Sequence, residues 1–263
     1  MKMTEKLYYH DFYITETIAK VIEIDLEKGI VFDKTIAFPE GGGQEGDQGI
    51  LIPLDCPNIE ILFTDTQKGH GTNIYLDKFP AIQVNTPIYH KIGEEYYKHF
   101  QENKEFLIKI NIERRAMLTL NHSGIHAVLM GIETVRPNFA NAVFGAHISI
   151  ERARLDFITD IKFTQEELKV VKEYVDSLLK NDSKIKSYQH PNEKEAWYWE
   201  CENKIYPCGG THLDSLGYIG EVKLKRKNLG KNSERIIAEF INYRLPIELY
   251  KKETLANYIN INS

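Results

Sequence analysis

The stretch Asn121-His122-Ser123-Gly124-Ile125-His126 places two histidines four residues apart inside a long helical pattern. Apolar side chains recur there at steps of three and four residues, at Met117, Leu120, Ile125, Val128, Leu129 and Ile132. The pattern predicts a helix from Ile112 to Ile132, which Arg136-Pro137 ends. Because residues i and i+4 lie on one face of a helix, His122 and His126 can present two imidazoles to one metal ion.

A second metal-capable pair lies in the stretch Cys208-Gly209-Gly210-Thr211-His212. Its two glycines allow the backbone to turn so that the thiol and the imidazole face one ion. Either pair alone is common without a metal. One pair on a helix and one in a glycine-rich loop together predict a zinc site made of His122, His126, Cys208 and His212. The spacing leaves open whether the ion is structural or takes part in chemistry.

The first part of the chain, from Tyr8 to about Pro87, shows short strand-like runs separated by turns. This pattern predicts a small β-barrel, which we assign to residues 1–90. The loop from Phe38 to Gly49 holds five glycines within nine residues. A structural turn is favoured over a ligand-binding loop, because the loop has neither the Lys-Ser/Thr of a P-loop nor the helix that follows a dinucleotide motif.

The remaining chain predicts an α+β domain over residues 91–245. A hairpin is expected from about Ala142 to Ile158, and Thr164-Gln165-Glu166-Glu167 is a capping box that opens an amphipathic helix to about Leu179. Strands are expected at residues 185–188, 205–206, 218–224 and 235–240. Residues 246–263 form a C-terminal appendage with one further expected helix.

Composition limits the cellular setting of the protein. Three cysteines in 263 residues are too few and too scattered for a disulfide framework, which favours a reducing compartment. We find no apolar signal segment at the N-terminus and no continuous apolar stretch long enough to cross a membrane. The chain is therefore expected in the cytoplasm, without a membrane partner. The formal net charge of -5 means that nucleic-acid binding requires a local basic patch.

Several motifs resemble the editing domain of alanyl-tRNA synthetases, and they occur in the order found in that family. They are Phe38-Pro39-Glu40-Gly41-Gly42-Gly43-Gln44 with Asp47 and Gly49, Arg114-Arg115 followed by Asn121-His122-Ser123-Gly124-Ile125-His126, Gly145-Ala146-His147 with Arg154-Leu155-Asp156-Phe157, Cys208-Gly209-Gly210-Thr211-His212, and Leu216-Gly217-Tyr218-Ile219-Gly220. The match covers roughly residues 15 to 242. No aminoacylation domain accompanies it, so the chain resembles the free-standing AlaX-type members that carry the glycine-rich domain.

This resemblance implies an N-terminal β-barrel followed by an α+β editing domain similar to the second additional domain of alanyl- and threonyl-tRNA synthetases. It implies a zinc-dependent deacylase that hydrolyses seryl-tRNA(Ala), with glycyl-tRNA(Ala) as a further substrate. The zinc ligands carried over by motif are His122, His126, Cys208 and His212, which with Ser123 form the expected catalytic set. The loop residues expected to help discriminate the substrate are Gly41, Gly42, Gly43, Gln44 and Asp47.

The expected chemistry raises two questions. Four protein ligands fill a tetrahedral zinc ion and usually mark a structural site, so the ion must either leave a position open for water or orient the aminoacyl group for attack by a free water. Serine must also be read by a polar side chain. Ser123 is the first candidate for this role, and the alternative is that it is a small helix residue that allows close packing. Many relatives carry Gln or Thr two residues before the glycine of the hairpin, where this chain has Val143. This difference puts the serine preference in question.

Basic residues flank the metal pairs in the sequence and are candidates for contacts with tRNA phosphates. They are Arg114, Arg115, Lys223, Lys225, Arg226 and Lys227, with Lys231 and Arg235 nearby. A solvated strand surface is the alternative interpretation. Two alternative functions also stay open: an editing hydrolase for another mischarged tRNA, against which the glycine-rich loop argues, and a non-catalytic tRNA-binding protein with structural zinc.

Overall fold

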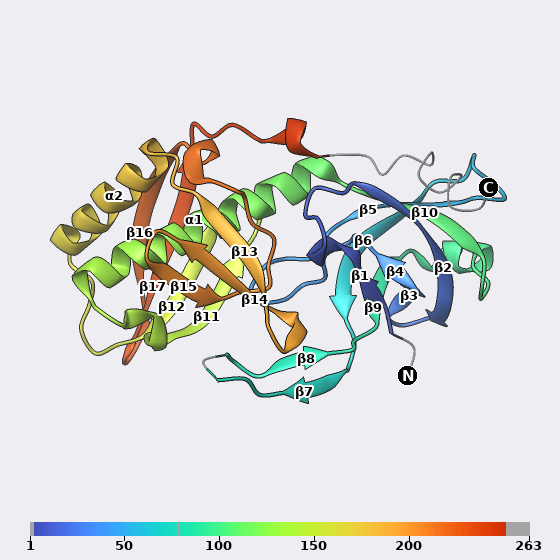
Figure 1. The fold of residues 1–263 in the computed structure, drawn as a ribbon, viewed down its shortest axis with the longest axis horizontal. Coiled ribbons are helices and arrows are strands. Elements are labelled where there is room, and N and C mark those ends of the chain that lie inside the picture. Colours follow the sequence, from blue (N-terminus) through green and yellow to red (C-terminus); the bar gives the residue numbers. More distant parts are fainter. Residues whose placement is uncertain (1–2, 78, 251–263) are drawn as a thin grey trace. The chain divides into compact units, whose positions relative to one another are not determined.

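The computed structural model describes residues 3–77 and 79–250, drawn in colour in Figure 1. The chain forms two compact units. Among the described residues, the first contains 3–41, 46–115 and 247–250, and the second contains Gly42–Glu45 and Ala116–Pro246. The division differs from the sequence-based boundary near residue 90, because a strand beyond that point belongs to the first unit.

The first unit is built around a closed barrel in which all neighbouring strands are antiparallel. The strand order is β10 (Glu105–Ile110), β2 (Glu16–Asp25), β3 (Gly29–Phe32), β9 (Ile88–Ile92), β6 (Ile61–Lys68) and β5 (Gly49–Pro53). β10 pairs with both β2 and β5 and so closes the barrel. The prediction of a small N-terminal barrel is confirmed, with its last strand later in the sequence than expected.

Apolar side chains alternate along the barrel strands and fill the interior. In β10 the residues Phe106, Ile108 and Ile110 are buried, and they pack with Phe32 and Phe63 from other strands. The β2–β3 turn requires glycine, because Gly29 has a φ of 121° and a Cβ there would lie 2.2 Å from a backbone oxygen of β9. Both features favour closure of the sheet on itself.

Smaller elements complete the first unit. They are β1 (Glu5–Lys6), η1 (Leu7–Tyr9), β4 (Lys34–Thr35), β7 (Thr72–Ile74), β8 (Ile82–Val84), η2 (Glu94–His99) and η5 (Ile247–Leu249). The C-terminal helix expected from Pro246 to Tyr258 lies largely outside the described residues. Its described part contains only the single turn η5. No helix in the described part of the chain is long and apolar enough to cross a membrane.

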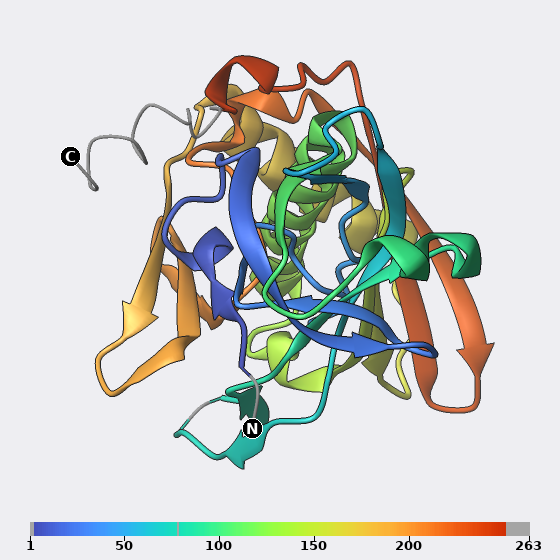
Figure 2. The same ribbon diagram turned by 90° about the vertical axis from the view of Figure 1, so that its right-hand side faces the viewer.

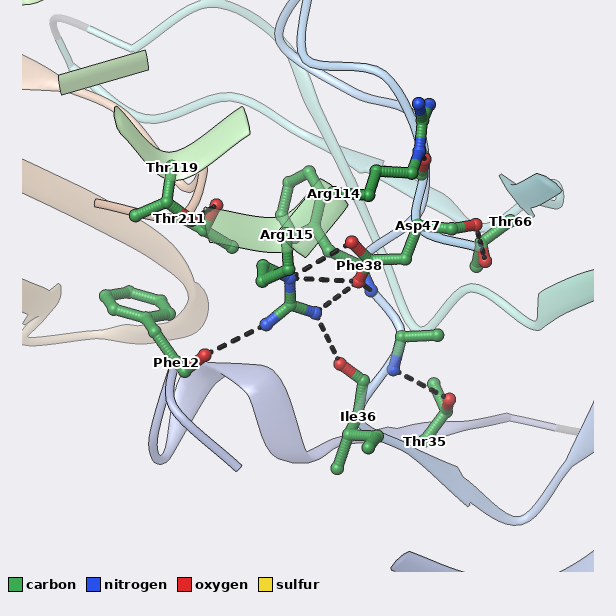
Figure 3. A network of polar contacts seen from close by, with 12 residues as sticks. Phe12, Thr35, Ile36, Phe38, Asp47, Thr66, Arg114, Arg115, Thr119 and Thr211 are labelled. Carbon is green, nitrogen blue, oxygen red and sulfur yellow. Dashed lines mark hydrogen bonds and ion pairs between the residues drawn. The ribbon is translucent and has the colours of Figure 1, made fainter. Parts of the chain in front are cut away.

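A buried ion pair fixes the end of the glycine-rich loop inside the first unit (Figure 3). The Nε of Arg115 donates to both carboxylate oxygens of Asp47, at 3.1 and 3.0 Å. The other guanidinium nitrogens donate to the carbonyls of Phe12 at 3.0 Å and Ile36 at 2.7 Å, and Asp47 also accepts the backbone N–H of Phe38 at 2.7 Å. Since both side chains are buried, each charge depends on the other for compensation.

Replacing Asp47 by Asn is therefore expected to lower the free energy of unfolding by about 3–5 kcal/mol, because the buried guanidinium loses its counter-charge. Urea denaturation followed by circular dichroism measures the change. Asp55→Asn is the control: its ion pair with Lys104 is largely exposed on the Asp55 side, and the expected cost is below about 1 kcal/mol. Equal effects of the two substitutions would contradict the importance of the buried pair.

The second unit has a four-stranded antiparallel sheet in the order β11 (Val143–Ile148), β12 (Ala153–Ile158), β17 (Ser233–Ile241) and β16 (Glu221–Gly230). Figure 2 shows β16 and β17 as a long orange-red hairpin. A three-stranded sheet contains β13 (Ile185–His190), β14 (Glu193–Cys201) and β15 (Lys204–Pro207). The short turns η3 (Phe139–Ala142) and η4 (Leu216–Tyr218) connect these elements. The α+β class is confirmed, although β14 was not expected from the sequence.

Two helices follow the sequence patterns closely. The long helix α1 spans Ile112–Val135, and α2 spans Gln165–Lys180. Thr164 caps α2 in a complete capping box with Glu167, as predicted. The predicted apolar face of α2 is also buried, at Leu168, Val171, Val175, Leu178 and Leu179.

Glycines in α1 allow its close packing within the second unit. A Cβ at Gly124 would lie 2.3 Å from the Phe240 ring on β17, and one at Gly131 would lie 3.0 Å from Val171 on α2. Gly124 lies two residues from His122 and two residues from His126, and a step of two residues corresponds to roughly 200° of rotation around a helix. His122 and His126 consequently lie on the side of α1 that faces away from the Phe240 contact.

Candidate metal centre

Four side chains from two distant parts of the sequence meet beside α1. His122 and His126 come from α1, and Cys208 and His212 come from the loop after β15. One ligand atom from each of the four lies within 4.8 Å of the others. The Sγ of Cys208 is 3.4 Å from Nε2 of His122 and 3.1 Å from Nε2 of His212. The structure therefore brings together all four residues expected to hold the ion.

The Cys208–His212 loop approaches α1 closely only because it contains glycine. A Cβ at Gly210 would lie 2.1 Å from Cε1 and 2.4 Å from Nδ1 of the His122 ring. The N–H of Cys208 donates to the carbonyl of Trp197 at 2.8 Å, which attaches the start of the loop to β14. Glycine at position 210 is needed here for space next to an imidazole, in addition to any role in turning the chain.

Burial sets the protonation of the four side chains. It lowers the pKa of His126 to about 3, and with nearby histidines it lowers the pKa of His122 and His212 well below their usual value. Burial also raises the pKa of the Cys208 thiol to about 12. The imidazoles are therefore neutral at pH 7 and offer lone pairs, whereas the thiol must lose a proton to become a ligand.

The residues present fit a zinc ion. Three imidazoles and one thiolate are a donor set that zinc prefers, and within the described residues the cluster contains no carboxylate. The Nδ1 atoms of His126 and His212 are buried and have no hydrogen-bond partner among the described residues.

The four side chains of the centre differ in their exposure. His122 and His212 are buried, whereas His126 and Cys208 are half-buried. Trp199 and Tyr206 stack beside the ring of His126, with centroid distances of 4.7 and 5.8 Å. Because Trp199 and Tyr206 are themselves buried, the exposed part of the centre is limited to the partly accessible His126 and Cys208.

The structure does not support the expectation that Ser123 faces the substrate. Ser123 is fully buried, and its hydroxyl donates to the carbonyl of Thr119 at 2.9 Å. The same oxygen accepts the N–H of Leu213 at 2.9 Å, so the side chain links α1 to the residue after His212. The alternative interpretation, a small residue that allows close packing, fits this arrangement. Val143 is half-buried against the core and offers no hydrogen bond for a serine hydroxyl either.

The candidate tRNA contacts separate into paired and exposed side chains. The structure overturns the expectation for Arg115, which is committed to its buried ion pair, and Arg114 donates to the carbonyl of Gly46 at 3.1 Å. Arg226 forms a two-pronged pair with the buried Glu234, at 2.9 and 3.1 Å, and so is also structural. The exposed candidates on β16 are Lys223, Lys225 and Lys227, of which Lys225 also forms an ion pair with Glu239 at 2.8 Å. β16 is the edge strand at the far side of the sheet from β11.

The residues of the expected substrate loop divide between the two units. Gly41 and Asp47 belong to the first unit, whereas Gly42, Gly43 and Gln44 belong to the second. There Gln44 forms a parallel bridge with Ile148 at the end of β11. The loop therefore adds an isolated β-bridge beside β11, which the glycine pattern did not predict.

Comparison with known proteins finds relatives among tRNA synthetases and tRNA editing proteins. A family model described as "Threonyl and Alanyl tRNA synthetase second additional domain" matches residues 199–237, which include Cys208 and His212. The alanyl-tRNA editing protein AlaX-M of Pyrococcus horikoshii is 29% identical over 245 residues, covering 90% of this chain and 97% of that protein.

Longer relatives carry the same region as part of a ligase. The alanine–tRNA ligase of Methanopyrus kandleri is 30% identical over 258 residues, and one of Saccharolobus islandicus is 28% identical over 244 residues. They are matched over 89% and 85% of this chain, which spans only 26% and 25% of their own lengths. The chain is similar to the editing region of alanine–tRNA ligases, and to the free-standing editing protein AlaX-M over nearly the whole length of both proteins.

Replacing Ser123 by Ala is expected to destabilise the protein by about 1–3 kcal/mol, since the buried N–H of Leu213 loses its acceptor. The ratio of hydrolysis rates for seryl- and alanyl-tRNA should stay unchanged. Chemical denaturation measures the first effect and a deacylation assay the second. Ser177→Ala on the exposed side of α2 is the control, with an expected change within about 0.5 kcal/mol. A selective loss of serine discrimination in Ser123→Ala would restore its role in reading the substrate.

Proposed function

We propose that this protein hydrolyses the ester bond between a wrongly attached amino acid and the terminal adenosine of tRNA, with zinc held by His122, His126, Cys208 and His212. The observation that carries this proposal is the convergence of those four ligand atoms within 4.8 Å at a half-buried position. Similarity to an alanyl-tRNA editing protein over 90% of the chain supports it. Three free cysteines suit a reducing compartment, so we place the activity in the cytoplasm.

The substrate we propose is seryl-tRNA(Ala), with glycyl-tRNA(Ala) as a further substrate. The names of the relatives, an alanyl-tRNA editing protein and alanine–tRNA ligases, support tRNA(Ala). An editing site must spare alanine, which differs from serine by one hydroxyl. A site that hydrogen-bonds a substrate hydroxyl can reject the analogue without it by about 10⁴–10⁵. The hydroxyl of Ser123 makes both of its hydrogen bonds inside the fold. The groups that recognise the serine side chain are therefore expected on the partly exposed side of the centre, near His126.

The reaction adds one water across the ester. The water oxygen bonds to the carbonyl carbon, the bond from that carbon to the ribose oxygen breaks, and the ribose oxygen takes up a proton. Zinc, when bound, supplies a Lewis acid that stabilises developing negative charge or lowers the pKa of a bound water to about 7. The residues of the chain keep three imidazoles neutral by burial and leave one side of the centre accessible. An aminoacyl ester is already activated, so orientation alone supplies several kcal/mol of the required acceleration.

The second candidate function is a tRNA-binding protein whose zinc is structural. A complete set of four protein ligands favours it, because catalytic zinc usually has three. A third candidate, an editing hydrolase for a different tRNA, has the same kind of metal centre. Deacylation assays with seryl-, glycyl- and alanyl-tRNA(Ala), together with a measurement of bound zinc, separate the three candidates.

Replacing His126 by Ala is expected to remove both bound zinc and deacylation of seryl-tRNA(Ala). The loss of several kcal/mol of transition-state stabilisation corresponds to a fall in rate of more than about a hundredfold. Metal analysis and release of labelled serine measure the two effects. His10→Ala is the control, since His10 is exposed and lies outside the cluster. A His126→Ala protein that keeps zinc and full activity would rule out this site.

The exposed lysines of β16 provide a test of tRNA binding. Replacing Lys223, Lys225 and Lys227 together by Ala should weaken tRNA binding and reduce the slope of log affinity against log salt by about one per lysine. Fluorescence anisotropy at several salt concentrations measures both quantities. The matched control replaces Lys169, Lys172 and Lys180 on α2. An unchanged salt slope in the β16 variant would show that tRNA contacts another surface of the protein.

A further inference from the structure

We infer that Gln44 is a positioning residue for the metal centre: it fixes the tautomer of His122 so that this imidazole presents Nε2 to the ion. The inference deepens the metal site proposed above and rests on it. The glycine-rich loop then has a role in metal binding. The Gln44 side chain holds His122 and does not contact the substrate.

The orientation of the Gln44 amide follows from its neighbours. Gln44 is fully buried, and its Oε1 lies 3.1 Å from the backbone nitrogen of Thr211. A backbone N–H can only donate, so the amide atom that faces it must be the oxygen. The amide Nε2 then donates to the hydroxyl oxygen of Thr211 at 3.1 Å.

The same oxygen determines the protonation of His122. Oε1 of Gln44 lies 2.7 Å from Nδ1 of His122. Because an amide oxygen can only accept, Nδ1 must carry the proton. In a neutral imidazole with a proton on Nδ1, the lone pair is on Nε2. Nε2 is the atom of His122 that lies 3.4 Å from the Sγ of Cys208, inside the cluster of ligand atoms.

His122 differs in this respect from the other two histidines of the centre. The Nδ1 atoms of His126 and His212 have no hydrogen-bond partner among the described residues. Within that part of the chain, His122 is the imidazole of the centre whose ring is held by a hydrogen bond from outside the ligand set. Such partners of a metal-binding histidine orient the ring and typically change metal affinity by about 10–100-fold when removed.

The backbone delivers Gln44 to this position through Gly43. Gly43 has a φ of 87°, and a Cβ there would lie 2.8 Å from the backbone of Ala146. Its carbonyl accepts the N–H of Ile148 at 2.7 Å, and the N–H of Glu45 donates to the carbonyl of Ile148 at 3.0 Å. These bonds attach the segment to the end of β11, so the Gln44 side chain is directed at α1 by the sheet of its own unit.

Zinc affinity of the full-length, zinc-loaded protein tests the inference by competition with a chelator. Gln44→Met keeps the size of the side chain and removes the acceptor, and we expect about 10–100-fold weaker zinc binding. Gln44→Glu keeps an oxygen toward both N–H groups, and affinity should stay within a few-fold of the wild type or rise. Thr119→Val is the matched control: it removes a hydroxyl 2.8 Å from that of Thr211 in the same network without touching His122, and affinity should change little.

A second measurement covers the case in which Gln44→Met does not fold. Nitrogen-15 NMR of the zinc-loaded wild type and Gln44→Glu proteins identifies which ring nitrogen of His122 carries a proton. We expect a protonated Nδ1 and a metal-bound Nε2 in both. Metal bound through Nδ1 of His122 would overturn the inference.

The affinity series gives the other decisive outcomes. Wild-type affinity in Gln44→Met would overturn the inference, and so would equal losses in Gln44→Met and Thr119→Val, which would reduce Gln44 to a packing role. If the wild-type protein binds no zinc, the proposed metal site itself is wrong. Because the readout is zinc affinity, loss of the role of Gln44 is distinguished from failure of the proposed deacylase activity.

Discussion

The second unit depends on the satisfaction of buried polar groups where the Cys208–His212 loop meets α1. The N–H of Thr211 is paired with Gln44, and the N–H of Leu213 is paired with Ser123. Leaving one such buried group unpaired costs about 1–3 kcal/mol, so the loop has little freedom to move away. The two pairs of ligands are therefore brought together by the protein's own hydrogen bonds, before any contribution from an ion.

The glycine-rich loop shows how a single short segment serves both units. Asp47 compensates the buried charge of Arg115 within the barrel unit, and Gln44 reaches His122 and Thr211 within the other. Neither side chain is free to act as a solvent-facing recognition group. The glycines next to these two residues are needed because the backbone passes very close to other atoms, as at Gly43 beside Ala146 and at Gly46 beside Thr66. A loop with this composition can thus be structural and still be required for the chemistry of the site.

Burial explains why the centre suits a metal and a reactive ester. Neutral imidazoles and a protonated thiol avoid the cost of placing isolated charges in the interior, and binding of a divalent ion then displaces the proton of Cys208. The half-buried pair His126 and Cys208 defines the direction of access. The exposed lysines of β16 lie at the opposite edge of the sheet from β11, the strand whose last residue bridges to Gln44.

The sequence by itself determined the helices, the barrel, the α+β class and the grouping of His122, His126, Cys208 and His212. These follow from periodicity and local spacing, which report which face of an element is buried. The roles of Ser123, Gln44, Arg115 and Arg226 were decided only by the tertiary structure. Their hydrogen bonds and ion pairs join residues brought together by the fold, as with Gln44 and His122, which are 78 positions apart in the chain. Local patterns contain no information about which buried donor such a side chain must satisfy, because that depends on how closely two backbones approach.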